Sequence, residues 1–145
     1  MPLLPFTDSL VESHKGDSDL CRLADRHYSR GMVGAVQFMP PGRTLVLRDM
    51  LGEIVFGWLW CLEGLRYDKQ AGFCCTIFRN ESKRRSSDVI LEAEAVAVAK
   101  WGRNRMFTYV DPDHVASPNP GYCFKMAGWI FAGKSLSGLH LLEKR

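Results

Sequence analysis

Short blocks of apolar residues recur along the chain and are separated by polar, glycine-rich or proline-containing stretches. Blocks of this length with β-branched and aromatic residues are typical of strands. The first two are separated only by the turn-forming stretch Asp49–Gly52, so they predict a hairpin. In chain order, the predicted strands are Thr44–Arg48, Glu53–Cys61, Gly72–Arg79, Met106–Val110, a strand that starts with Trp129–Phe131, and Leu139–Glu143.

Three segments have helical spacing instead. In the first, the apolar residues Leu20, Leu23, Ala24 and Tyr28 follow Ser18, which we expect to be the N-cap. The other two are Asp88–Trp101, capped by Ser87 and closed by Gly102, and Asn119–Ala127, capped by Asn119, with Pro120 in its first turn and Gly128 as its stop. Asp88–Trp101 is apolar nearly all round, so we expect it to be well buried against a sheet.

The order of these elements predicts an α/β fold with a central mixed, twisted sheet flanked by helices. The strand–helix–strand unit from Gly72 to Val110 implies a parallel pair with a right-handed crossover, and the leading hairpin adds antiparallel strands. The length of 145 residues suits one domain. We expect residues 1–17 to form a peripheral N-terminal arm of that domain.

The charge of the chain is uneven. The net charge is +3, and residues 1–20 contribute −3, which leaves +6 for the rest. A basic body is suited to a polyanionic partner such as nucleic acid or to a phosphorylated cofactor. The apolar runs are too short to span a membrane, and the apolar start Met1–Thr7 lacks the basic flank of a signal peptide. We therefore expect a cytoplasmic protein without a membrane partner.

The five cysteines are odd in number and have no CxxC spacing, so the sequence predicts small buried thiols rather than disulfides or a zinc site. The histidines His14, His114 and His140 have no cysteine or carboxylate partner at ligand spacing, so no metal site is expected. Trp58 and Trp60 lie two apart on one face of a strand; core packing is favoured over a base-stacking platform.

The element order, the core from Arg79 to Asp111 and the closing segment Asn119–Trp129 resemble the GNAT acyltransferase superfamily over roughly residues 18–145. The resemblance implies a transferase that acts on an amine and holds its donor at the loop and helix after the third predicted strand. Typical acetyl-CoA enzymes have a glycine-rich loop there, whose backbone N–H groups hold the pyrophosphate. This chain has Lys83, Arg84 and Arg85 instead. The donor therefore stays open: an acyl-CoA and another activated donor such as an aminoacyl-tRNA are both compatible.

A narrower resemblance is carried by Asp25–Arg30, by the basic loop, and by Tyr109–Pro112 before Asn119. These segments look like the Mom-type DNA-modification proteins of bacteriophages, which add a carbamoylmethyl group to the exocyclic amine of adenine. The resemblance implies DNA as the partner, an anti-restriction role and the cytoplasm of a bacterial host. A CoA-dependent N-acetyltransferase and a GNAT-fold binding module without catalysis remain alternatives. The oligomeric state, a homodimer included, is open.

The residues that these readings select fall into three groups. Candidate catalytic residues are His27, Tyr28, Asp111 and Tyr122; candidate cofactor-binding residues are Arg79, Asn80, Lys83, Arg84, Arg85, Ser86, Ser87 and Asn119; candidate substrate-binding residues are Ser29, Arg30, Ser117 and Lys125. Histidine titrates nearest neutral pH, and Arg79 and Asn80 end a central strand, where ligands of open α/β sheets bind.

Each of these residues also has a structural interpretation that the sequence does not exclude. His27 can cap its helix and Tyr28 can pack in the core. Asp111 can cap the turn made with Pro112, and Tyr122 can be a core residue rather than a general acid. Lys83–Arg85 can be a solvated loop rather than a phosphate-binding one.

Overall fold

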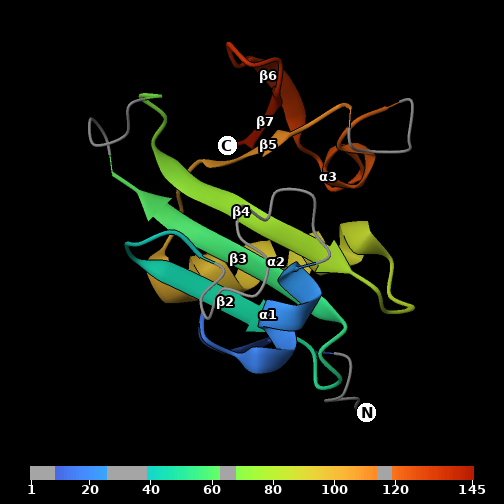
Figure 1. Ribbon diagram of the computed structural model, residues 1–145. Helices are drawn as coiled ribbons and strands as arrows, with labels where there is room; N and C mark the ends of the chain where they lie inside the picture. Colours follow the sequence, from blue (N-terminus) through green and yellow to red (C-terminus); the bar gives the residue numbers. More distant parts are fainter. Residues whose placement is uncertain (1–8, 26–38, 63–67, 114–118) are drawn as a thin grey trace. The chain divides into compact units, whose positions relative to one another are not determined.

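The computed structural model describes residues 9–25, 39–62, 68–113 and 119–145. Within these residues the seven strands belong to one mixed sheet, in the order β1-β2-β3-β4-β5-β7-β6 (Figure 1). This confirms the α/β class with a mixed sheet. The elements are β1 (Val11–Glu12), α1 (Ser18–Ala24), β2 (Thr44–Arg48), β3 (Ile54–Cys61), β4 (Gly72–Asn80), α2 (Ser86–Trp101), β5 (Met106–Val110), α3 (Tyr122–Met126), β6 (Ile130–Lys134) and β7 (His140–Lys144).

The chain divides into two compact units. The first takes the chain up to Leu59 together with Thr76–Arg84, and the second takes Trp60–Cys75 and Arg85–Arg145. Strands β3 and β4 therefore contribute residues to both units. The expectation of a single domain with a peripheral N-terminal arm stays a prediction.

The first unit is built on the β2–β3 hairpin, which is antiparallel from Thr44 opposite Leu59 to Arg48 opposite Val55. Helix α1 lies against β2 and β3 (Figure 1), because its apolar side chains bury themselves there. Strand β1, which the sequence did not predict, pairs antiparallel with β2. The buried cluster of this unit consists of Leu20, Leu23, Ala24, Met39, Val46, Val55 and Ile77.

The N-cap of helix α1 lies one residue before the expected one. Its N-cap is Asp17, whose Oδ1 accepts hydrogen bonds from the backbone N–H groups of Asp19 and Leu20. The expected cap, Ser18, is the first helical residue. Asp17 is preferred because its other carboxylate oxygen also accepts from Arg48 Nη1 at 2.8 Å, which links the helix start to the hairpin.

The second unit contains the predicted strand–helix–strand crossover. Strands β4 and β5 are parallel from Phe73 opposite Met106 to Cys75 opposite Thr108, which confirms the predicted parallel pair. Strand β7 pairs antiparallel with β5 and with β6. Gly72, at the start of β4, has a φ of +123°, and a Cβ there would lie 2.3 Å from the Arg105 carbonyl oxygen. Only glycine fits this close approach.

The two later helices also differ from expectation at their starts. Helix α2 has Arg85 at its N-cap position and buries Ser87 inside its first turn, so Ser87 is not its cap. Helix α3 starts after Gly121, whose φ is +74°, and not at Asn119. The predicted stops Gly102 and Gly128 follow their helices with positive φ. Helix α2 is buried on one face only, since Leu91 is exposed on another.

Candidate functional site

The loop that follows β4 is closed by the side chain of Asn80. Asn80 Oδ1 accepts hydrogen bonds from the Ser82 backbone N–H at 2.9 Å and the Ser82 hydroxyl at 2.6 Å. Asn80 Nδ2 donates to the Arg84 carbonyl oxygen at 2.8 Å, and the Arg84 N–H donates to Ser82 Oγ at 3.1 Å. Two polar side chains thus shape the backbone of a loop that has no glycine. Ser82 was not among the predicted site residues, although an Asn-x-Ser turn of this kind is visible in the sequence.

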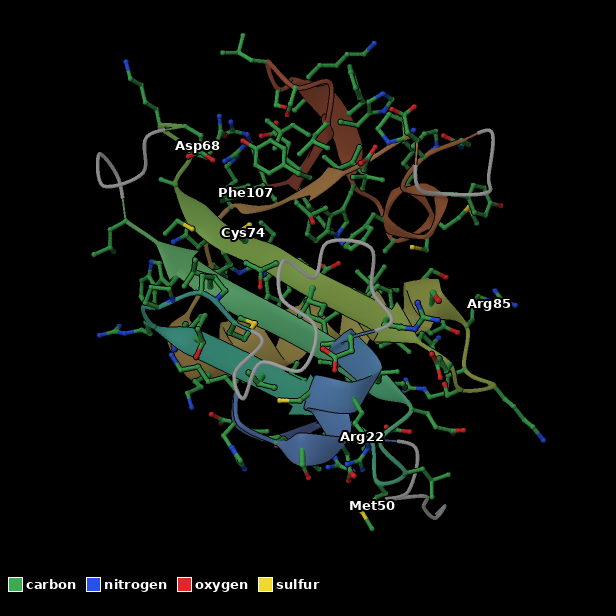
Figure 2. All side chains as sticks on the ribbon, in the orientation of Figure 1. Arg22, Met50, Asp68, Cys74, Arg85 and Phe107 are labelled. Carbon is green, nitrogen blue, oxygen red and sulfur yellow. The ribbon has the colours of Figure 1, made fainter. Side chains whose placement is uncertain are left out.

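Helix α2 begins directly after this loop. Its N-cap residue, Arg85, makes no side-chain hydrogen bond to the first turn, and Asp88 is the acidic residue of that turn. The N-terminus of a 16-residue helix carries a partial positive charge. Lys83 and Arg85 are exposed, and Figure 2 shows Arg85 at this end of α2. Among the described residues, neither side chain has a hydrogen bond or an ion pair, so both cations can reach a ligand. Ser87 is buried, which makes it a packing residue here.

Arg79 lies at the end of β4 and is already paired. Its Nε donates to Glu81 Oε2 at 2.6 Å, and both side chains are about one-third exposed. A ligand phosphate would have to compete with this carboxylate. Arg79 is therefore a weaker anion-binding candidate than Lys83 or Arg85.

Asp111 follows β5 and closes a turn. Its Oδ1 accepts a hydrogen bond from the Asp113 N–H at 2.9 Å. This is the turn-capping role that the sequence left open for Asp111. The carboxylate is partly exposed, so the role of general base stays a prediction.

The residues predicted near α3 are on the surface. Tyr122 is 54% exposed, so the interpretation of Tyr122 as a core residue is wrong. Lys125 Nζ donates to Asn119 Oδ1 at 2.6 Å, which brings together two of the predicted site residues. Tyr122 and Lys125 are three residues apart in a helix of five residues.

Five predicted site residues lie outside the described residues, and nothing in the structure tests them. They are His27, Tyr28, Ser29, Arg30 and Ser117.

One polar contact in the second unit was missed by the sequence analysis. The Tyr109 hydroxyl on β5 donates to Asp68 Oδ2 at 3.2 Å. Figure 2 shows Asp68 near the start of β4, with Cys74 and Phe107 on the two paired strands. The two partners are 41 residues apart, and no local pattern relates residues at that separation.

The remaining candidate chemistry is limited. No group of three or more His, Cys, Asp or Glu residues that could hold a metal ion occurs in the part of the chain that the structure describes. None of the five cysteines, all of which lie in the described residues, forms a disulfide, and Cys61, Cys74 and Cys75 are buried. Trp58 is fully buried against Phe56, as core packing predicts, whereas Trp60 is only partly buried. No helix among the described residues is both long and apolar enough to cross a membrane.

Comparison with known proteins identifies the fold. No protein-family model matches the chain, and no curated protein matches it significantly. Among solved structures, a Bordetella pertussis protein assigned to the GnaT-family acetyltransferases is similar over 100% of both chains, with a TM-score of 0.59 and 12% identity. An acyl-CoA N-acyltransferase from Pseudomonas aeruginosa is similar over 94% of this chain and 99% of its own, with a TM-score of 0.57 and 11% identity. The chain therefore has the fold of GNAT acyltransferases.

Proposed function

We propose that this chain is a GNAT-type transferase that takes an acyl-like group from a phosphate-bearing donor and passes it to an amine. The observation that carries the proposal is the start of α2, where the exposed Arg85 occupies the N-cap position without a side-chain hydrogen bond and the exposed Lys83 precedes it by two residues in the chain. Cations and a helix N-terminus together attract phosphate. The class of chemistry is supported by the full-length likeness to an acetyltransferase and an N-acyltransferase.

The acceptor that we infer is the exocyclic amine of adenine in DNA, as the Mom-type resemblance implies. Two features support a nucleic-acid acceptor: the loop carries cations where acetyl-CoA enzymes carry glycines, and the chain beyond residue 20 has a net charge of +6. The adenine amine is a poor nucleophile because its lone pair is delocalised into the ring. Positioning and a base that removes the proton must supply the rate, and in a duplex the base must first be extruded.

Within this proposal, each candidate residue has a chemical role. His27 or Asp111 accepts the proton of the amine, and the exposed Tyr122 hydroxyl protonates the leaving group. Lys83 and Arg85 hold the phosphates of the donor or of DNA. Asn80 holds the loop in shape through its hydrogen bonds to Ser82 and Arg84.

The donor site is tested by calorimetric titration of the protein with acetyl-CoA and with pyrophosphate. Arg85→Glu should weaken the binding of either probe by about tenfold or more, as expected for a lost charge-assisted hydrogen bond. Arg103→Glu is the matched control, since Arg103 is also exposed but follows the other end of α2. Equal losses in both variants, or no binding of either probe, would contradict the donor site.

The acceptor is tested by expressing the protein in bacteria and analysing nucleosides of the total DNA by mass spectrometry. A new adenosine species is expected with the wild type and should disappear with His27→Ala or with Asp111→Asn, which retains an oxygen for the turn. Asp113→Asn, two residues further on and exposed, should leave the modification intact. Unmodified DNA combined with acetylation of a free amine would identify the CoA-dependent N-acetyltransferase instead. If neither product forms, the chain is a binding module.

A further inference from the structure

Strand β6 combines an open sheet edge with exposed apolar side chains. It is the last strand in the sheet order, so among the described residues it pairs on one side only, with β7. Ile130 is 61% exposed and Phe131 is 48% exposed, and Ala132 after them is also exposed. At the opposite edge of the sheet, β1 is only two residues long and contains Glu12, which leaves little for a partner strand.

The two exposed side chains of β6 lie on opposite faces of the sheet. Ile130 is opposite Glu143 and Phe131 is opposite Leu142, and consecutive residues of a strand point to opposite faces. A globular surface that docks on one face would cover only one of them. A strand that extends the sheet covers both, because its own side chains alternate between the same two faces, and it also pairs with the outer N–H and C=O groups of β6.

A second copy of β6 fits this edge through its charge pattern. Lys134, at the C-terminal end, is the charged residue of the strand, and it follows Ile130, Phe131, Ala132 and Gly133. In an antiparallel pair of identical strands the two Lys134 side chains lie at opposite ends of the seam. The apolar residues of the two copies then face one another, with no pair of like charges directly opposite.

Ala132 is the extra residue of a bulge between Phe131 and Gly133, so Ile130 and Phe131 lie in the part of β6 before the irregularity. A two-fold axis close to Phe131 places the Ile130 and Phe131 side chains of both copies at the centre of the seam and leaves the two Lys134 side chains outside it.

We infer that two copies of this chain associate through β6 as an antiparallel pair about a two-fold axis, which continues the sheet from one copy into the other. The interface is isologous, as in most homodimers. Its apolar centre is formed by Ile130 and Phe131 of both copies.

Light scattering coupled to size-exclusion chromatography tests this dimer. The wild type should have twice the chain mass of 16.4 kDa and should dissociate on dilution. Ile130→Glu and Phe131→Glu should each raise the dissociation constant by about tenfold or more, because each places a carboxylate in the apolar centre. Two variants are used because Phe131 also contacts the His140 ring, with centroids 5.2 Å apart, whereas Ile130 has no such ring contact in the described chain.

Leu136→Glu is the control, because it adds the same charge at a fully exposed apolar residue of the turn that follows β6. It should leave the mass unchanged. In hydrogen exchange, the amides of residues 130–134 should be protected in the dimer and should lose protection when it is diluted. A wild type that stays monomeric at every concentration would overturn the inference. So would a dimer that survives both strand variants, or one that leaves the exchange of residues 130–134 unaffected.

Discussion

A single carboxylate, Asp17, organises the first unit at the scale of one residue. Asp17 caps α1, accepts a hydrogen bond from the Ser13 hydroxyl at 2.6 Å, and pairs with Arg48 Nη1 at 2.8 Å. Both side chains of the pair are largely shielded from water. The same guanidinium donates from Nε to the Asp49 carbonyl oxygen. Arg48 therefore holds a helix start and a hairpin turn together.

The first prediction follows from the pKa of Asp17. Burial by itself would raise this pKa, but the hydrogen bonds from Ser13, Arg48 and the Leu20 N–H, together with the charge of Arg48, lower it from 3.8 to about 2. A carboxyl group whose pKa is lowered in the folded state stabilises the fold above its unfolded pKa. That stabilisation is lost as the pH falls from 3.8 towards 2.

Asp17→Asn should therefore lower the free energy of unfolding by roughly 1–2 kcal/mol at neutral pH and by much less near pH 2. Urea unfolding followed by circular dichroism across this range measures the difference. Glu12→Gln, which removes a carboxylate from the exposed β1, is the control, and its loss of stability at neutral pH should be smaller. If the difference in free energy of unfolding between Asp17→Asn and the wild type stayed constant down to pH 2, the lowered pKa of Asp17 would be contradicted.

The second prediction concerns Gly72. Gly72→Ala places a Cβ 2.3 Å from a backbone carbonyl oxygen at a φ of +123°, whereas Gly138→Ala, at a φ of +89°, meets nothing within 4 Å. Gly138→Ala should cost about 1 kcal/mol of stability from backbone strain alone. Gly72→Ala should cost about 3 kcal/mol or more, because backbone atoms must also move. Thermal unfolding of the two variants gives the difference, and equal losses would exclude the clash as its cause.

At the scale of elements, the loop between β4 and α2 is shaped by side chains rather than by glycines. The third prediction is that Asn80→Ala loosens this loop, because the bonds to Ser82 and to the Arg84 carbonyl are lost together. We expect a loss of about 1–3 kcal/mol and faster hydrogen exchange at residues 82–84. Asn80→Asp retains the acceptor oxygens, so its stability and its hydrogen exchange at residues 82–84 should lie between those of Asn80→Ala and the wild type. Unchanged exchange in Asn80→Ala would show that the neighbouring backbone holds the loop without Asn80.

The element scale also separates what the sequence predicts from what it does not. Strands β2 and β5 match their predicted bounds, and the other predicted strands match within one or two residues, because a run of apolar residues is a local signal. The predicted helix N-caps were wrong because long-range contacts select them, whereas the predicted C-terminal stops Gly102 and Gly128 were confirmed. Arg48, 31 residues from Asp17, favours Asp17 over Ser18 as the cap. Gly121 precedes α3 because a Cβ there would collide with Leu142.

The candidate site shows the same division. The basic segment Lys83–Arg85 can be selected from the sequence because it is continuous in the chain and departs from a known pattern at one place; its role in phosphate binding stays a prediction. Two contacts depend instead on the side-chain conformations in the folded protein. They are the hydrogen bond from Tyr109 to Asp68 and the ion pair of Arg79 with Glu81. The exposure of Ile130 and Phe131 could not be predicted either. From the sequence alone, a strand of apolar residues is expected to be buried. Only the strand order in the folded sheet identifies β6 as an edge strand.

At the scale of the whole molecule, charge is the property that bears on the proposed acceptor. The net charge of +3 is small, so attraction of DNA by the overall charge alone would be weak. Removing any three cations would then lower the affinity for DNA by the same amount. A localised phosphate site predicts the opposite: most of the loss of DNA affinity should come from removing the few cations at that site. The affinity for DNA as a function of salt distinguishes the two, because each phosphate contact contributes to the slope of log K against log salt.

The fourth prediction compares two triple variants of equal charge. Replacing Lys83, Arg84 and Arg85 with serine removes three cations beside the start of α2. Replacing Lys100, Arg103 and Lys134 removes three exposed cations elsewhere, and both changes bring the net charge from +3 to zero. In fluorescence-anisotropy titrations with a short duplex, the first variant should lower the salt slope by about 2–3. The second should change the slope by less than about 1. Equal changes in the two variants would mean that DNA responds only to overall charge, and the segment before α2 would then hold the donor alone.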